Sequence, residues 1–212
     1  KRRGGIAYTI LAVLLIAASV VAACTVFFRV EEVTVEGNER YSQEQILSVA
    51  SVEMGANMIL TPGEQIAQRI YRALPYVDHV EVQKRFPTTL KMVITESQPV
   101  AVITGAASAW IVDAKGKLLE QADETQAQEY TKVTGLELLE PEQGAQAQTT
   151  PENQAQLDGL TAMTTALASC GLMEGMTSID VSSKTEIVMV YDGRLTVKVL
   201  NNVDFDRKLK AL

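Results

Sequence analysis

An uncharged apolar run, Ile6 to Phe28, is the strongest constraint on what this chain can fold into, because it extends for 23 residues. As a helix, it would be about 34 Å long, enough to cross the roughly 30 Å hydrocarbon core of a bilayer. Three cations, Lys1 to Arg3, precede the run, whereas most charged residues that follow it at once are acidic. Since short cytoplasmic flanks carry the excess of Lys and Arg, we expect residues 1–5 in the cytoplasm, residues 6–28 across the membrane and the remainder outside.

Two other interpretations of this run compete with a retained membrane anchor. A cleaved signal peptide has an apolar core of only about 7–15 residues, which is shorter than the run here. The segment Val21 to Cys24 also resembles the lipobox of bacterial lipoproteins, in which the cysteine is lipidated and becomes N-terminal. Because apolar residues continue through Phe28, where a lipoprotein would have a polar tether, the retained anchor is favoured.

Charge and cysteine content exclude several kinds of protein. With the three N-terminal cations set aside, 16 of the 19 basic residues remain against 26 acidic ones, a net charge of −10. Nucleic acids and anionic lipid headgroups are therefore not expected as partners. The two cysteines, Cys24 in the apolar run and Cys170 far along the chain, cannot form a disulfide framework. The part outside the membrane must therefore rely on its hydrophobic cores.

Residues 30–74 carry the signals of one strand followed by two helices. Val30 to Val35 alternates loosely between apolar and polar residues and ends at a Gly-Asn turn. A capping box, with Gln45 three residues after the first position, predicts a helix over Ser42 to Val52. A Thr cap followed by Pro predicts a second helix over Thr61 to Leu74, with apolar residues at four-residue spacing on one face.

The stretch from Leu74 to Val102 predicts a β-hairpin with one apolar face. Its inward-facing residues are expected to be Val80, Val82, Phe86, Leu90, Met92 and Ile94. The two preceding helices would cover that face. Lys84 and Arg85 lie next to the bend, where solvent is the ordinary environment, so no dedicated ligand site is expected there.

Beyond Val102 strand patterns dominate, which indicates a second domain. Strands are predicted in Ala109–Glu120, Lys132–Leu136 and Ile187–Leu200, the last of these a hairpin around an Asp-Gly type I′ turn. Residues 140–153 lack an apolar period and are expected to form a flexible loop. A helix starting near Thr150 follows, with its apolar face through Leu157, Leu160, Met163 and Leu167. A terminal helix is expected over residues 204–212.

No residue pattern points to catalysis. His79, the single histidine, lies in a predicted strand, and Cys170 lies near a helix end with no histidine nearby in sequence. The chain contains no nucleophile elbow, phosphate-binding loop, zinc-protease motif or EF-hand loop. We therefore expect no enzymatic activity, no catalytic, cofactor-binding or metal-binding residues, and no small-molecule substrate.

The order strand, helix, helix, strand, strand after a membrane anchor resembles a POTRA domain. The matching segments are Val33–Ser42, Leu74–Glu96 and Gln98–Val102. The resemblance implies an α+β chain with a single transmembrane helix, a POTRA domain over residues 29–102 and a mixed β-rich domain over residues 103–212. Outer-membrane barrels that carry POTRA domains are excluded, because no long series of alternating strands follows.

A single N-terminal anchor, one POTRA domain and one β-rich domain together resemble the FtsQ/DivIB family of bacterial cell-division proteins. That family shares the Asp192-Gly193 turn and a late lysine, here Lys208. The resemblance implies a non-catalytic scaffold of the divisome at the division septum. It would bind FtsL and DivIC, or FtsB in Gram-negative bacteria, and help regulate septal peptidoglycan synthesis. Two features depart from the pattern: Asn201-Asn202 stands where the family has glycine, and the family continues past its last helix, so part of its partner-binding edge is expected beyond Leu212.

Unpaired strand edges are templates for a partner's strand, so two strands are candidate interaction edges. The residues of the first are Val80, Glu81, Val82, Gln83 and Lys84. The residues of the second are Leu195, Thr196, Val197, Lys198, Val199 and Leu200. A lipidated or secreted POTRA-like chaperone that binds extended peptides is the alternative function.

Overall fold

The structure, a computed structural model, describes residues 2–105, 108–201 and 205. By its internal contacts the chain divides into two compact units. The first unit comprises residues 1–71 and 77–96, and the second comprises residues 72–76 and 97–212. The residues after Glu96 are grouped with the second unit, whereas the sequence predicts a POTRA boundary at residue 102.

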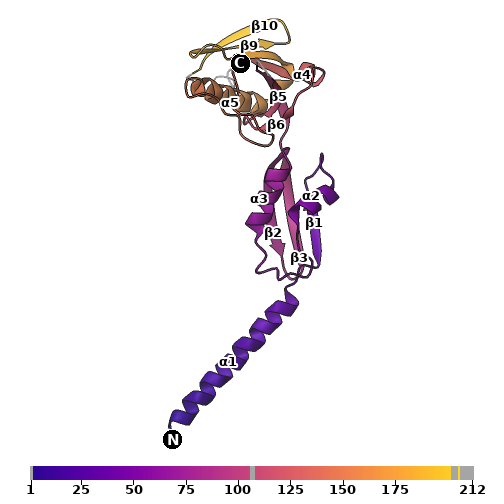
Figure 1. The fold of residues 1–212 in the computed structure, drawn as a ribbon, viewed down its shortest axis with the longest axis vertical. Helices are drawn as coiled ribbons and strands as arrows, with labels where there is room; N and C mark the ends of the chain where they lie inside the picture. Colours follow the sequence, from indigo (N-terminus) through magenta and orange to yellow (C-terminus); the bar gives the residue numbers. More distant parts are fainter. Residues whose placement is uncertain (1, 106–107, 202–204, 206–212) are drawn as a thin grey trace. The chain divides into compact units, whose positions relative to one another are not determined.

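The first unit begins with a long helix, α1 (Arg2–Phe27), seen at the N-terminus in Figure 1. Its stretch Tyr8–Phe27 has a mean hydropathy of 2.8 and is long and apolar enough to cross a membrane. None of that stretch is buried within the protein, and the helix is therefore a candidate membrane span. Cys24, the lipobox cysteine of the alternative interpretation, lies inside this helix.

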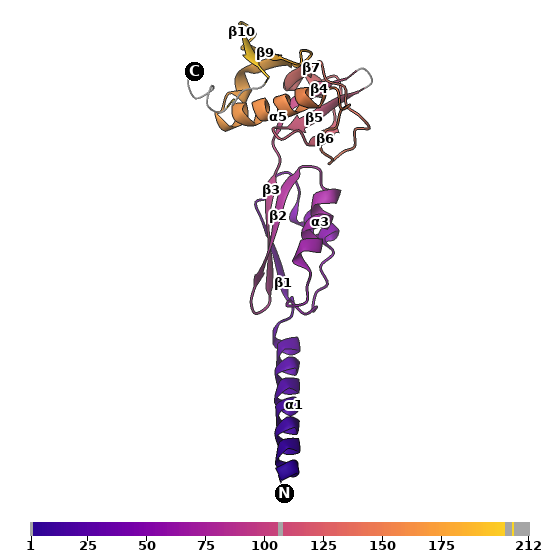
Figure 2. The ribbon, with the colours of Figure 1, turned by 90° about the vertical axis from the view of Figure 1, so that its left-hand side faces the viewer.

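A three-stranded sheet forms the core of the first unit, in the order β1-β3-β2. The strand β1 (Glu32–Glu36) pairs in parallel with β3 (Thr89–Glu96), which pairs antiparallel with β2 (Val77–Arg85). The helices α2 (Gln43–Ala50) and α3 (Gly63–Ala73) join β1 to β2, and α3 lies along one face of the sheet in Figure 2. Apolar side chains from both layers form the core: Ile46, Ile66, Ile70, Leu90, Met92 and Ile94.

Local signals explain how these helices begin and end. Ser42 and Gln45 form the expected capping box, in which the Ser42 hydroxyl accepts from the Gln45 backbone N–H at 3.2 Å. At the other end of α2, the Arg69 guanidinium donates to the Ala50 carbonyl at 2.6 Å. The second helix starts at Gly63, and the hydroxyl of Thr61, the expected cap, donates instead to the Asn57 carbonyl at 2.9 Å.

Phe86 departs from the expected inward orientation. Its side chain is exposed, because the strand β2 ends at Arg85 and the bend breaks the alternation there. The Phe86 ring packs edge-on against Phe28, with 5.4 Å between the ring centroids.

The second unit contains a seven-stranded mixed sheet, in the order β10-β9-β8-β7-β4-β5-β6. Its strands are β4 (Pro99–Thr104), β5 (Ala109–Asp113), β6 (Leu118–Gln121), β7 (Thr131–Thr134), β8 (Met176–Asp180), β9 (Glu186–Tyr191) and β10 (Leu195–Leu200). The remaining elements are α4 (Gln126–Glu129), α5 (Gln154–Ser169) and a short 3₁₀ helix, Met173–Gly175. The strand β4, expected as the exit from the POTRA domain, lies between β7 and β5 in this sheet.

The helix α5 supplies the apolar layer against this sheet. Its buried face contains the four predicted residues, Leu157, Leu160, Met163 and Leu167. They form one core with strand residues such as Ile103, Val133 and Ile179. Within the expected loop 140–153, the Ala147 N–H donates to the Gly116 carbonyl and the Gly144 N–H donates to the Leu118 carbonyl. These hydrogen bonds hold the segment beside the start of β6. The helix expected over residues 204–212 lies, except for Phe205, outside the described residues.

Candidate interaction edges

The first candidate edge, Val80 to Lys84, lies within β2 at one end of the three-stranded sheet. Among the residues that the structure describes, no strand pairs with β2 on its outer side. Glu81 is exposed, whereas Val80 is buried and the other three residues are half-buried. The Lys84 ammonium donates to the Ile59 carbonyl at 3.0 Å, so the loop before α3 lies beside the end of this strand.

The register of β3 shows which backbone groups of β2 face outward. Glu32 of β1 lies opposite Thr89, and its N–H donates to the Thr88 carbonyl at 3.3 Å. In a parallel pair, each residue forms backbone hydrogen bonds with the two residues on either side of the one opposite it, so the even-numbered residues of β3 direct their N–H and C=O groups to β1. The odd-numbered residues of β3 direct theirs to β2. Glu81 and Gln83 lie opposite such odd-numbered residues, so their backbone groups bond to β3. The outward N–H groups of this edge belong to Val80, Val82 and Lys84.

The second candidate edge, Leu195 to Leu200, is the whole of β10 at one end of the seven-stranded sheet. It pairs antiparallel with β9 through the expected turn, in which Asp192 and Gly193 have φ angles of 52° and 64°. Among residues 108–201 no strand pairs with its outer side. Four of its six side chains are exposed, and Val197 and Val199 are half-buried against the core.

The same reasoning identifies the outward backbone groups of β10. The Asn201 N–H donates to the Thr185 carbonyl at 2.8 Å, one step beyond the pair Leu200 and Glu186. Hydrogen-bonded and non-bonded pairs alternate in an antiparallel ladder, so Val199 and Val197 bond to β9. The outward N–H groups therefore belong to Thr196, Lys198 and Leu200. Lys198 has both an exposed side chain and an outward backbone N–H. A substitution at Lys198 can therefore remove this N–H without disturbing the core.

Sequence reasoning missed two further sheet ends and one anchoring residue. The strand β1 forms the other end of the three-stranded sheet and β6 the other end of the seven-stranded sheet, and only the pairing order reveals this. Asn201, noted as a departure from the family pattern, donates through its side chain to the Ala155 carbonyl at 3.0 Å. It lies so close to Gly159 that a Cβ at that glycine would clash with its amide. Asn201 therefore fixes the end of β10 against α5.

The two side chains considered for catalysis, His79 and Cys170, lie in different units. His79 is an exposed residue of β2 in the first unit, and Cys170 caps the end of α5 in the second. No group of three or more His, Cys, Asp or Glu side chains in the described part of the chain is arranged to hold a metal ion. A hollow of about 370 Å³ beside α2 and α3 is lined by residues that include Val52, Leu60 and Arg69.

Comparison with known proteins finds a domain family and several relatives to which the chain is similar. Residues 28–97 match the POTRA domain family of the FtsQ type. The cell division protein FtsQ of Geotalea daltonii is 32% identical over 120 residues, which are 55% of this chain and 42% of that protein. FtsQ of Neisseria meningitidis is 35% identical over 91 residues, 43% of this chain and 37% of the relative. The cell division protein DivIB of Clostridium acetobutylicum is 24% identical over 112 residues, 53% of this chain and 45% of the relative.

These matches cover less than half of the length of each of these relatives. Among solved structures, the major extracytoplasmic domain of the trans isomer of DivIB from Geobacillus stearothermophilus is 16% identical, with a TM-score of 0.35. That match covers 55% of this chain and 87% of the solved one. Residues 28–97 thus match the FtsQ-type POTRA family, and about half of the chain is similar to FtsQ and DivIB cell division proteins.

Proposed function

We propose that this chain is a non-catalytic, single-pass scaffold of the bacterial divisome. Its N-terminus would lie in the cytoplasm, α1 would cross the membrane, and the two units would act outside it at the division septum. The scaffold binds FtsL-like and DivIC- or FtsB-like proteins through its strand edges and thereby helps regulate septal peptidoglycan synthesis. The observation that carries the proposal is the outer side of β10, with outward backbone groups at Thr196, Lys198 and Leu200.

An extended segment of a partner would bind β10 by adding a strand to the sheet. The outward N–H and C=O groups recur at every second residue, which is the spacing that an incoming strand requires. Leu195 and Leu200, both exposed, offer apolar contacts at the two ends of the strand. The strand β2 is the weaker candidate, because its outward backbone groups belong to residues whose side chains are buried or half-buried.

A proline at Lys198 tests this proposal, because it removes an outward N–H and spares the ladder to β9. The matched control, Lys198→Ala, removes the same charge and keeps the N–H. Each variant would be the only copy in dividing cells, and co-purified FtsL-like and DivIC- or FtsB-like proteins would be measured after crosslinking. We expect Lys198→Pro to reduce their recovery by roughly tenfold and Lys198→Ala to change it little, since an exposed charge mainly affects association rates.

The fluorescence of Trp110, in the core of the second unit, checks that both variants remain folded. Full recovery of partners with a folded Lys198→Pro chain would refute binding at β10. In that case Lys84→Pro, compared with Lys84→Ala, tests the outward edge of β2 in the same way.

A further inference from the structure

Four large apolar side chains of the POTRA domain are exposed and lie on the two segments next to the end of α1. We call them the apolar foot: Met54, 61% exposed, Ile59, 48%, Leu60, 79%, and Phe86, 57%. Tyr71 is the only other large apolar side chain exposed in the described residues of this domain. Exposed apolar side chains gathered in one place indicate a binding surface more often than scattered ones do.

Backbone hydrogen bonds hold the loop of the foot against the residues that follow α1. The Val30 N–H donates to the Ala56 carbonyl at 2.9 Å, and the Gly55 N–H donates to the Val30 carbonyl at 2.7 Å. The Met58 N–H donates to the Phe28 carbonyl at 2.8 Å. The loop that carries Met54, Ile59 and Leu60 is therefore fixed within a hydrogen bond of the first residues outside the helix.

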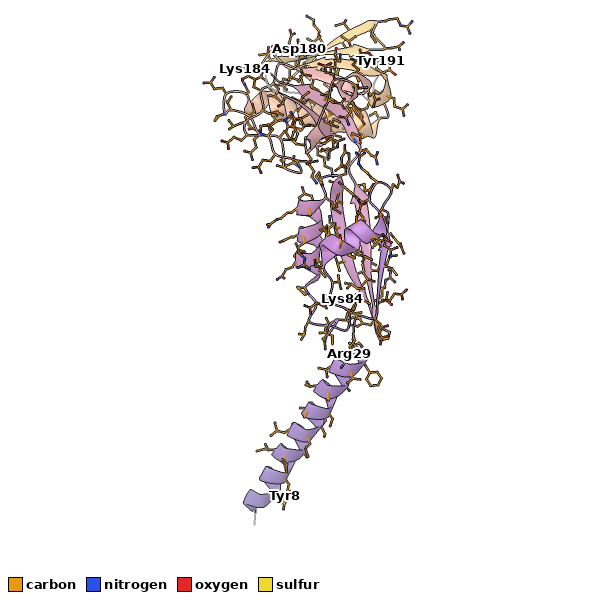
Figure 3. All side chains as sticks on the ribbon, turned by 45° about the vertical axis from the view of Figure 1, so that its right-hand side comes forward. Tyr8, Arg29, Lys84, Asp180, Lys184 and Tyr191 are labelled. Atoms are coloured by element: carbon orange, nitrogen blue, oxygen red, sulfur yellow. The ribbon has the colours of Figure 1, made fainter. Side chains whose placement is uncertain are left out.

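The bend that carries Phe86 is held at the same place. Its ring contacts that of Phe28, and the Glu31 N–H donates to the Thr88 carbonyl at 2.9 Å. Figure 3 shows Arg29 and Lys84 at this end of the domain. The bend and the loop thus surround the chain where it leaves α1.

The helix itself continues into these residues without a linker. The Phe28 N–H donates to the Cys24 carbonyl at 3.3 Å, and the Arg29 guanidinium donates to the Thr25 carbonyl at 3.1 Å. The stretch Tyr8–Phe27, 20 residues long, spans about 30 Å, which is the thickness of the hydrocarbon core. With that stretch across the membrane, residues bonded to Phe28 would lie within the polar layer of the bilayer, about 5–8 Å thick on each side.

We propose that the apolar foot is embedded in the interfacial layer of the membrane that α1 crosses. This inference rests on the proposed membrane anchoring. Apolar and aromatic side chains favour that layer, because their apolar parts leave water while the backbone around them keeps polar neighbours. The foot limits how far the POTRA domain can tilt or move away from the membrane, and so restricts where the interaction edges lie relative to it.

The charges at this end favour apolar embedding over attraction to anionic lipids. Three cations lie here, Arg29, Lys84 and Arg85, and acidic residues lie beside them, Glu31 and Glu32 on the chain and Glu53 in the loop. Because the two signs balance, the contact is expected to form on zwitterionic lipid as readily as on anionic lipid.

Tryptophan probes in the full chain, reconstituted in phosphatidylcholine vesicles, test this inference. In a Trp110→Phe background, Leu60→Trp reports the foot, Leu14→Trp reports the centre of α1, and Tyr71→Trp is the matched control. Tyr71 precedes β2, which runs toward the bend over about 25 Å, so it lies at the opposite end of the domain. All three positions are exposed, so folding should survive.

Lipids brominated high on the acyl chain quench only tryptophans near the interface. We expect Leu60→Trp to lose at least about half of its intensity in them and Tyr71→Trp to stay unquenched, whereas Leu14→Trp is quenched by deeply brominated lipid. Because tryptophan itself favours interfaces, Met54→Ser and Phe86→Ser are added to the Leu60→Trp chain, and the quenching should then fall about twofold or more.

Three outcomes overturn the inference. If Leu14→Trp is quenched and Leu60→Trp is not, α1 spans the membrane but the apolar foot is not embedded in the interfacial layer. Unquenched Leu14→Trp refutes the membrane anchoring itself. Quenching of Leu60→Trp that appears only when phosphatidylglycerol replaces half of the phosphatidylcholine would assign the contact to charge instead of apolar embedding.

Discussion

Gly37 lies so close to the carbonyl oxygen of Ile94 that a Cβ on Gly37 would sit 2.3 Å from that oxygen. Its φ of 81° is also in the left-handed region, which favours glycine. Gly55 shares the left-handed φ, at 82°, but has open space around its Cβ position. Substituting alanine at Gly37 and at Gly55 therefore separates two destabilising effects: a steric clash with Ile94, which only Gly37 has, and the left-handed φ, which both glycines share.

We predict that Gly37→Ala destabilises the first unit by about 3 kcal/mol or more and Gly55→Ala by about 1 kcal/mol. Trp110 is in the second unit and does not report this change, so amide hydrogen exchange in β1 to β3 is the suitable measurement. Equal protection of β3 amides in the two variants would show that the contact with Ile94 carries no energetic cost.

The Asp113 carboxylate, which is buried, holds together the turn between β5 and β6. It accepts from the N–H groups of Lys115 and Lys117, both at 2.9 Å, and from the Ser97 hydroxyl at 3.0 Å. We expect Asp113→Ala to lower the free energy of unfolding by about 2–4 kcal/mol, because three donors lose their acceptor in a buried site. Asp123→Ala is the control, since that exposed carboxylate accepts two similar backbone bonds and should cost under about 1 kcal/mol. Urea unfolding followed by Trp110 fluorescence measures both.

Asp180 provides a pH-dependent contribution in the second unit. Hydrogen bonds from the side chain and then the backbone of Ser182 lower the pKa of its carboxyl below the ordinary 3.8. A lowered folded-state pKa stabilises the protein above the unfolded value, and this contribution is lost as the pH falls through the folded pKa. We expect Asp180→Asn to be slightly less stable than the wild type at pH 7, with the difference shrinking below pH 3.8. The difference is small because Asp180 is exposed to solvent. A difference that grows on acidification would contradict the assignment.

The anchor predicts a strong effect of a charge at the centre of α1. Leu14→Arg should impair insertion, since a central arginine costs on the order of 3 kcal/mol on insertion scales. Leu14→Val is the control. Carbonate extraction measures how much protein stays in the membrane, and unchanged retention of the arginine variant would argue against a spanning helix.

Elements with local signals were predictable from the sequence. The capping box at Ser42 and the Asp192-Gly193 turn each depend on residues that are neighbours in sequence, and both are present in the structure. The burial of Leu90, Met92 and Ile94 follows from simple alternation. Phe86 was mispredicted because the bend at Pro87 ends that alternation, and alternation carries no information past the end of a strand.

Features set by long-range pairing were not predictable in the same way. The apolar run of β4 has the same pattern whether it ends the POTRA domain or enters the second sheet, and only pairing with β5 and β7 decides this. Likewise, periodicity predicts that β2 and β10 are strands, whereas the order of strands makes them edges. Which backbone N–H groups face outward depends on register, which is fixed by contacts far apart in sequence.

The most direct test of the proposed scaffold is site-specific photo-crosslinking from β10 in dividing cells. A benzophenone amino acid would replace Lys198, whose backbone N–H faces outward, and in a second strain Ala168, an exposed residue of α5 in the same unit. Mass spectrometry of the crosslinked products would identify the captured proteins. Binding at β10 predicts that position 198 captures FtsL-like or DivIC- or FtsB-like proteins and that position 168 does not. Equal capture from both positions, or no capture of a division protein from position 198, would contradict it.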